Sequence, residues 1–153
     1  MTNKSLGHAI AAIGLIVSMP LSAPLSAAGP QVTVYKTRTC GCCAKWVQHL
    51  SDNGFEVTVQ DVANTAEYRQ KFGVPEKLAS CHTAVVKGYA IEGHVPAGDI
   101  KRVLKTASKA KGLAAPGMPA GSPGMEGPRS DAYSVVLFDA QGNTTVYQKY
   151  PGN

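Results

Sequence analysis

Residues 32–50 read VTVYKTRTCGCCAKWVQHL, and this stretch decides the fold. Its first four residues alternate and are rich in β-branched side chains, which predicts a strand. Residues 42–53 place their large apolar side chains at helical spacing, so this segment predicts an amphipathic helix that an Asn-Gly pair brings to an end. Three cysteines therefore lie where a strand passes into a helix.

The remainder of the chain continues this mixture of strands and helices. The strand–helix–strand beginning favours a right-handed parallel crossover, and strands joined by short Gly-containing turns favour antiparallel pairing. We therefore predict an α/β fold, a thioredoxin-like mixed sheet with flanking helices, with a Gly/Pro/Met-rich loop at 112–130 and a C-terminal hairpin. The further strands are expected at 55–59, 84–86, 89–91, 133–138 and 144–150, and the further helices at 65–72 and 97–111.

The first 28 residues are typical of a secretory signal peptide. Lys4 supplies a basic start, residues 8–19 are apolar and uncharged, and small residues follow as far as Ala28. A transmembrane helix needs about 20 apolar residues, so this run is short for an uncleaved anchor, which is the alternative. We expect cleavage after Ala28, a mature domain at 29–153, a periplasmic location and no membrane attachment after cleavage.

Charge and motifs exclude several classes of function. The net charge of +5 falls to +4 once Lys4 is removed, and the basic residues are scattered except for a group at 101–111, which we interpret as the solvated face of a helix. No nucleic-acid-binding motif accompanies that group, so no nucleic-acid partner is expected. The signatures of serine hydrolases, P-loop proteins and zinc proteases are also missing from the sequence.

All four cysteines lie in the predicted mature chain, and their presence needs an explanation. A domain of this size buries a core without disulfides, and an oxidising compartment tends to convert idle thiols into disulfides. Cys40 and Cys43 have the C-x-x-C spacing of thioredoxin-like redox proteins, in which a helix N-terminus lowers the pKa of a thiol. Cys42 fits a redox pair poorly, because a third thiol invites exchange. In a thioredoxin-like arrangement, the loop that carries Cys81 faces the start of the first helix.

Four converging thiolates form a soft ligand set that suits Cu(I), zinc or an iron–sulfur cluster. The spacing does not match iron–sulfur proteins, whereas a four-cysteine zinc site stays open as an alternative. Met118 and Met125 repeat in two Pro-Gly-Met units, and a thioether ligand favours Cu(I) over zinc, although methionine also fills gaps in cores. His94 is a better candidate ligand than His82, because successive strand residues point to opposite faces.

Several motifs together resemble the CopG-type family of exported bacterial copper-resistance proteins. They are VYK at 34–36, CGCCAKW at 40–46, SCHT at 80–83, EGHVP at 92–96, the two Pro-Gly-Met units and YSVVLFD at 133–139. The resemblance extends over essentially the whole mature chain. It implies a thioredoxin-like fold, a periplasmic location and a role in copper tolerance, and it suggests redox conversion of copper. Carried over, the cluster ligands are Cys40, Cys42, Cys43 and Cys81, with Met118, Met125 and His94 as additional ligands.

Three hypotheses follow. The leading one is a periplasmic copper-binding protein for copper resistance, which holds one or several Cu(I) ions in the cysteine cluster. Such a protein exchanges copper with periplasmic chaperones or efflux components, and redox cycling of the metal makes it a copper oxidoreductase. The second is a thiol–disulfide oxidoreductase that uses Cys40 and Cys43. The third is a disulfide-stapled module without a metal.

Overall fold

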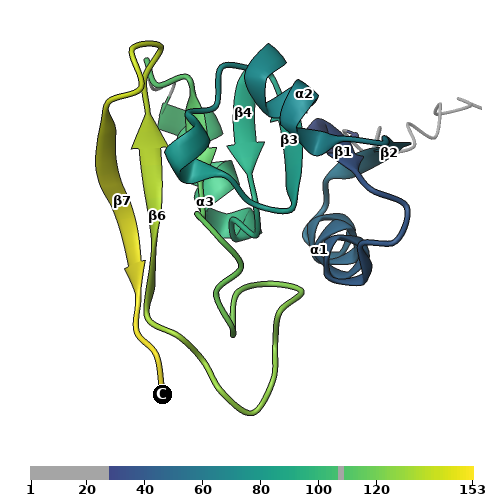
Figure 1. The fold of residues 1–153 in the computed structure, drawn as a ribbon, viewed down its shortest axis with the longest axis vertical. Helices are drawn as coiled ribbons and strands as arrows, with labels where there is room; N and C mark the ends of the chain where they lie inside the picture. Colours follow the sequence, from purple (N-terminus) through teal and green to yellow (C-terminus); the bar gives the residue numbers. More distant parts are fainter. Residues whose placement is uncertain (1–27, 107–108) are drawn as a thin grey trace, which may run out of the picture.

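The computed structural model describes residues 28–106 and 109–153, so the predicted signal peptide lies outside the described residues except for Ala28. Seven strands form one mixed sheet in the order β2-β1-β3-β4-β5-β6-β7 (Figure 1). The strands are β1 (Gln31–Lys36), β2 (Glu56–Asp61), β3 (His82–Val86), β4 (Tyr89–Glu92), β5 (Gly112–Ala114), β6 (Tyr133–Phe138) and β7 (Thr144–Tyr150). The helices are α1 (Gly41–Asp52), α2 (Thr65–Lys71) and α3 (Ala97–Thr106), and a short 3-10 helix spans Glu76–Leu78.

The first part of the sheet has the predicted topology. Helix α1 connects β1 to β2, and these two strands pair in parallel, while β1 pairs with β3 in antiparallel and β3 with β4 in antiparallel. Strands β6 and β7 form the predicted C-terminal hairpin. The α/β class, the mixed sheet and the hairpin are therefore confirmed.

The alternation of side chains along β1 explains how the helices are distributed over the sheet. Val34 points to the face on which Trp46 of α1 and Ile100 of α3 complete the larger core cluster. Tyr35 points to the other face, where its ring stacks on Tyr68 of α2 with 4.2 Å between the ring centroids. The two faces of this mixed sheet are thus covered by different helices, as is usual in α/β domains.

Two sequence-based predictions near residue 112 are wrong. Helix α3 spans Ala97–Thr106, so the predicted helix at 97–111 is too long, and the predicted loop at 112–130 begins with strand β5. Strand β5 pairs in parallel with β4 and in antiparallel with β6. A Cβ at Gly112 would lie 2.0 Å from the carbonyl oxygen of Ala90, so a glycine is needed for this close approach of two strands. The sequence suggested a helix end at Gly112 because glycine commonly ends helices and also occurs where two strands approach closely.

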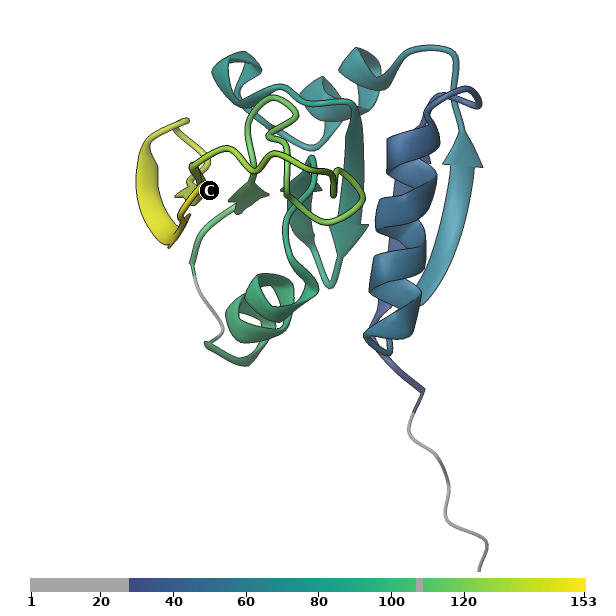
Figure 2. The same ribbon diagram turned by 90° about the horizontal axis from the view of Figure 1, so that it is seen from below.

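Residues 115–132 connect β5 to β6 without helix or strand, and we call residues 115–131 of this connection the 115–131 loop. It leaves the sheet beyond β5 and reaches the side of α1 before it returns to β6 (Figure 2). Its turns are closed by backbone hydrogen bonds, among them Met125 N–H to Ser122 C=O at 2.8 Å and Asp131 N–H to Ala120 C=O at 2.9 Å. The loop therefore has a defined course beside the sheet.

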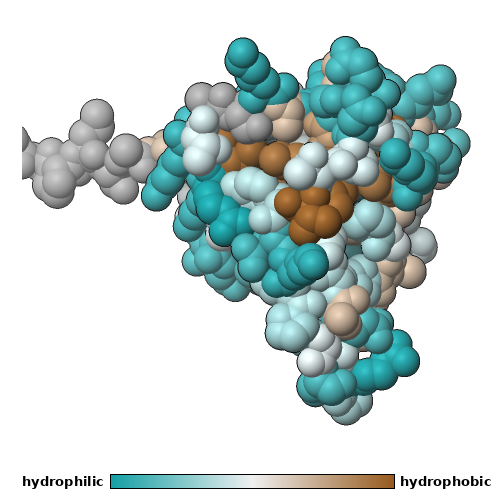
Figure 3. All heavy atoms as spheres, turned by 90° about the vertical axis from the view of Figure 1, so that its left-hand side faces the viewer, coloured by the Kyte–Doolittle hydropathy of each residue, from teal (hydrophilic) through white to brown (hydrophobic). Residues whose placement is uncertain are grey.

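Strands β2 and β7 are the two edges of the sheet. The side of the molecule seen from β7 is largely hydrophilic around a small hydrophobic patch (Figure 3). Val146 of β7 is 52% exposed. Within residues 28–106 and 109–153, no helix is long and apolar enough to cross a membrane.

The burial of β5 yields a first prediction. Leu113→Ala is expected to lower the free energy of unfolding by about 2–5 kcal/mol, because the side chain is fully buried in the larger core cluster and its removal leaves a cavity. Leu104→Ala on α3, where the leucine is half-buried, is the control and should cost clearly less. Denaturant unfolding measures both. A loss below about 1 kcal/mol for Leu113→Ala would contradict the packing of β5.

Candidate metal centre

The turn between β1 and α1 delivers three cysteines to one end of the sheet. Cys40 caps α1: its N–H donates to the Thr37 carbonyl at 3.1 Å, and its own carbonyl accepts from Ala44 N–H at 3.3 Å. Cys42 and Cys43 lie in the first turn of the helix. Cys43 is fully buried and Cys42 half-buried, so the motif faces inward.

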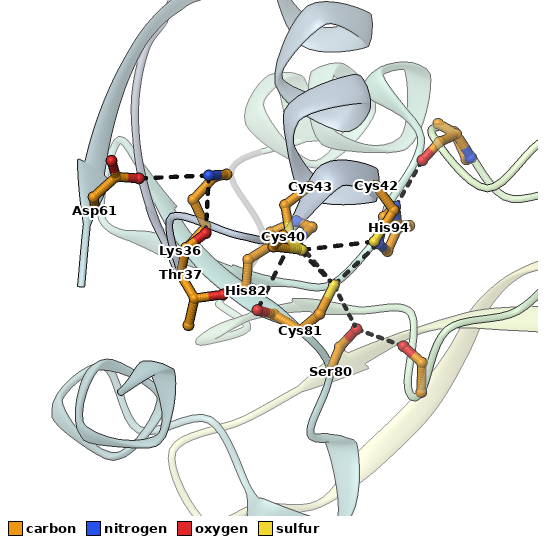
Figure 4. The surroundings of a disulfide bond; sticks show 12 residues. Lys36, Thr37, Cys40, Cys42, Cys43, Asp61, Ser80, Cys81, His82 and His94 are labelled. Atoms are coloured by element: carbon orange, nitrogen blue, oxygen red, sulfur yellow. Dashed lines mark hydrogen bonds and ion pairs between the residues drawn. A yellow bond between two sulfur atoms is a disulfide. The ribbon is translucent and has the colours of Figure 1, made fainter. Parts of the chain in front are cut away.

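Cys81 reaches the same place from the turn between the 3-10 helix and β3 (Figure 4). The sulfur atoms of all four cysteines lie within 4.8 Å of one another, as a group that could hold a metal ion. Cys40 and Cys43 form a disulfide, while Cys42 and Cys81 are free thiols. Sγ of Cys81 lies 3.5 Å from Sγ of Cys43, and Sγ of Cys42 lies 3.6 Å from Sγ of Cys40. The structure thus brings together the four cysteines that the sequence singled out.

The electrostatic surroundings keep the free thiol of Cys81 protonated. Burial, and then the neighbouring thiol of Cys42, raises the pKa of Cys81 to about 12. A metal ion that binds thiolate must therefore displace the proton from Cys81. Reduction of the Cys40–Cys43 disulfide makes two further thiols available in the same space. The capacity of the cluster for a soft metal thus depends on its redox state.

Two histidines adjoin Cys81 rather than one. Nε2 of His94 lies 3.1 Å from Sγ of Cys81, and Nδ1 of His82 lies 3.3 Å from the same atom. Cys81, His82 and His94 form a second group of residues that could hold a metal ion. Our expectation that His82 points to the opposite face fails because β3 begins at His82, so strand alternation does not include Cys81.

Burial keeps both imidazoles neutral. It lowers the pKa of His82 to about 3 and is also the main cause that lowers the pKa of His94. The ring of His82 packs on Trp46 with 4.3 Å between centroids, and its Nε2 is buried without a hydrogen-bond partner among the described residues. A neutral imidazole with a free nitrogen is a suitable ligand for copper or zinc.

A buried carboxylate that the sequence did not single out holds the Cys81 turn in place. Glu92 is fully buried on β4, and it accepts hydrogen bonds from Ser80 N–H at 2.8 Å and from the Thr83 hydroxyl at 2.6 Å. Arg69 supplies the opposite charge at 3.4 Å. Ser80 and Thr83 flank Cys81, so Glu92 fixes both sides of the segment. A single acidic residue at the end of a short strand gives no signal of this role.

A buried lysine performs a similar task for the first cysteine turn. Nζ of Lys36 donates to the carbonyl of Thr37 at 2.9 Å and lies 3.4 Å from the carboxylate of Asp61 on β2. Lys36 is 6% exposed. A buried ammonium group is costly unless it is paired, which this arrangement provides. The turn that leads to Cys40 is therefore anchored to two strands.

The two candidate methionines lie in the 115–131 loop. Met118 is 55% exposed, so its thioether is open to solvent instead of enclosed among the cysteines. Met125 is half-buried, and its backbone takes part in the turn at 121–125. Their role as ligands stays a prediction.

Known proteins resemble the chain in two ways. A family model for glutaredoxin matches residues 32–73, and a model described as a protein of unknown function, DUF411, matches residues 78–125. No curated protein matches the chain. The glutaredoxin match covers β1, α1, β2 and α2, and it agrees with the thioredoxin-like arrangement of these elements.

Two solved structures are similar over most of the chain. The structure described as "Copper resistance protein copG- Form 2" shares 44% identity, covers 80% of this chain and 99% of its own, and has a TM-score of 0.77. The structure described as "Copper resistance protein copG- Form 1" shares 46% identity, covers 80% of this chain and 98% of its own, and has a TM-score of 0.75. At this identity the likeness concerns the sequence as well as the fold.

The burial of His82 predicts a pH dependence of stability for the metal-free protein. Its pKa is about 3 in the folded state against 6.5 for an ordinary histidine, so below pH 6.5 the unfolded chain binds a proton that the folded chain does not. The free energy of unfolding should therefore fall as the pH falls from 7 to 4, with His82 contributing a slope of up to about 1.4 kcal/mol per pH unit.

Denaturant unfolding at several pH values measures this slope in the wild type and in His82→Gln, which removes the titrating group. The variant is expected to lose stability less steeply on acidification. Equal slopes in the two proteins between pH 7 and pH 5 would show that His82 titrates normally in the folded state.

Proposed function

The chain belongs to the CopG family of copper resistance proteins, and we propose that it serves copper resistance by holding Cu(I) in its cysteine cluster. The observation that carries this proposal is the convergence of four cysteine sulfurs within 4.8 Å of one another. Thiolate sulfur is the ligand type that Cu(I) prefers, and a group of sulfurs this dense suits one or several ions. The cluster ligands of the proposal are Cys40, Cys42, Cys43 and Cys81.

His94 completes the ligand set through Nε2, which faces Cys81 at 3.1 Å. Met118 and Met125 add soft ligands from the 115–131 loop. Thioether sulfur supports copper over zinc, which is the alternative metal for a four-cysteine site. Because Met118 is exposed, we propose that its thioether contacts copper that arrives from solvent or leaves for a chaperone or an efflux component.

The disulfide connects copper binding to redox chemistry. In the oxidised form Cys40 and Cys43 are bonded to each other, and Cys42 and Cys81 are the free thiols. Two electrons and two protons convert the disulfide into two thiols, which the cluster needs to be complete. In the proposed function the protein therefore holds most copper when an external thiol reductant has supplied these electrons. An external two-electron oxidant that restores the Cys40–Cys43 disulfide removes two of the four thiolate ligands and lowers the copper capacity.

We also propose that the protein works in the periplasm after removal of residues 1–28. Strand β1 begins at Gln31, so cleavage after Ala28 leaves every strand of the sheet intact. Protein purified from the periplasm of a bacterial host should have the intact mass of residues 29–153. Ala28→Arg, which removes the small residue at the cleavage point, should keep the longer mass. A wild-type protein that stays in the cytoplasm or keeps residues 1–28 would contradict export and cleavage.

The structure also offers support for a second candidate function. The Cys40–Cys43 disulfide lies at the N-terminus of α1, and the glutaredoxin model matches this part of the chain. Unpaired N–H groups at a helix N-terminus stabilise a thiolate, as thiol–disulfide oxidoreductases require. Such an enzyme needs the disulfide pair alone and has no use for Cys42 or Cys81.

Variants of the two remaining thiols distinguish these functions. Anaerobically reduced wild type is expected to bind Cu(I), and Cys42→Ser Cys81→Ser should lose most of the bound copper, because half of the thiolate ligands are removed. His49→Gln, on α1 but outside the cluster, is the control and should bind as the wild type does. Metal analysis after removal of free copper gives the number of ions per chain.

Copper binding that is unchanged in the double variant would contradict the cluster. Insulin reduction that persists in the double variant, without copper binding in the wild type, would favour the oxidoreductase. Zinc retained in preference to copper would favour the zinc alternative.

A further inference from the structure

The 115–131 loop is tied to the segment that carries Cys81. The N–H of Gly117 donates to the carbonyl of Ala79 at 3.0 Å, and the hydroxyl of Ser80 donates to the carbonyl of Gly117. These two bonds join the start of the loop to the two residues that precede Cys81. The loop is therefore attached to the cluster on this side through its backbone.

The middle of the loop holds the ring of His94. Nδ1 of His94 lies 2.8 Å from the carbonyl oxygen of Pro123. A carbonyl oxygen can only accept a hydrogen bond, so Nδ1 must carry the proton. The lone pair of a neutral ring then lies on Nε2, which is the nitrogen that faces Sγ of Cys81 at 3.1 Å. The carbonyl of Pro123 thus selects the tautomer whose free nitrogen points into the cluster.

Gly124, the next residue, explains how the loop comes close enough for the Pro123 carbonyl to contact His94. Gly124 has φ +85°, and a Cβ in its place would lie 2.8 Å from the carbonyl oxygen of Cys42 and 2.8 Å from the backbone nitrogen of Trp46. Both atoms belong to the backbone of α1 and cannot move aside cheaply. Glu126 accepts the N–H of Gly124 at 2.8 Å, so the glycine reaches the helix without leaving a polar group unpaired.

We propose that Pro123 and Gly124 form a positioning device for the metal centre, in which Gly124 seats the loop on α1 and the Pro123 carbonyl fixes His94 with Nε2 toward Cys81. Gly124 is a positioning residue, because it acts on the ligand only through Pro123 and His94. The inference rests on the proposed function in taking His94 as a ligand.

His82 shows what the device adds. Its Nε2 has no hydrogen-bond partner among the described residues, and its Nδ1 lies 3.3 Å from Sγ of Cys81. His94 is held on one nitrogen by a carbonyl and presents the other nitrogen to the cluster. Of the two histidines, His94 is the one whose ring nitrogen away from Cys81 lies against a carbonyl oxygen of the 115–131 loop.

The test compares two glycine substitutions in the same loop. Gly124→Ala places a Cβ against α1, whereas Gly117→Ala has the same left-handed strain, with φ +72°, but its Cβ has no atom within 4 Å. Gly117→Ala also retains the backbone N–H and C=O that make the two hydrogen bonds to Ala79 and Ser80. The two variants thus share the backbone cost of alanine at positive φ and differ in the contact with the helix.

The first measurement uses the metal-free protein, so it does not depend on copper binding. Long-range ¹H–¹⁵N correlation spectra report which ring nitrogen of His94 carries the proton. Wild type and Gly117→Ala should show the Nδ1–H form, and Gly124→Ala should lose it. An Nε2–H form in the wild type would overturn the proposal even if Gly124→Ala fails to fold. A folded Gly124→Ala variant that keeps the Nδ1–H form would also overturn the proposal.

The second measurement uses the Cu(I)-loaded protein. Gly124→Ala should lose the imidazole contribution in X-ray absorption and bind Cu(I) about 10- to 100-fold more weakly, the range that loss of an outer partner of a ligand produces. Gly117→Ala should match the wild type in both. Equal weakening in the two variants would attribute the effect to backbone strain and overturn the positioning role. No copper binding in the wild type would contradict the proposed function, while the tautomer result stands on its own.

Discussion

The antiparallel pairing of β1 with β3 is the constraint on which the candidate centre depends. In this register Lys36, the last residue of β1, lies opposite His82, the first residue of β3. The chain that leaves β1 and the chain that enters β3 therefore meet at the same end of the sheet. This brings Cys43 and Cys81 together although 38 positions separate them in the sequence. A slip of one residue in this pairing would turn His82 to the other face and disperse the cluster.

The same end of the sheet is buried, and burial decides the charge state of the groups collected there. Burial raises the pKa of the Cys81 thiol and lowers the pKa of His82 and of His94, so these three groups are uncharged in the metal-free protein. The charges that are buried nearby, Glu92 and Arg69, are paired and serve the turn that carries Cys81. Uncharged ligands next to paired charges can accept a soft cation in exchange for a thiol proton without leaving a lone charge in the interior.

The sequence was sufficient for features that depend on local patterns. Alternation identified β1 and β2, helical spacing identified α1, and the C-x-C-C motif at the strand–helix junction identified three members of the cluster. Features that depend on partners far along the chain were missed. Strand β5 consists of three small or apolar residues, and it is a strand because β4 and β6 lie on either side of it. Glu92 resembles any surface acid until its three partners are known.

The 115–131 loop shows why composition alone cannot separate a positioning segment from a flexible linker. Gly117 and Gly124 stand in the same Pro-Gly-Met context, so the sequence does not distinguish them. Their backbones do not distinguish them either, because both have positive φ. The difference lies in what faces them, which is open space for Gly117 and the backbone of α1 for Gly124. The contact of Gly124 with α1 is the one that determines how near the Pro123 carbonyl comes to His94. A repeated motif can therefore contain one glycine required by a turn and another required by a neighbour.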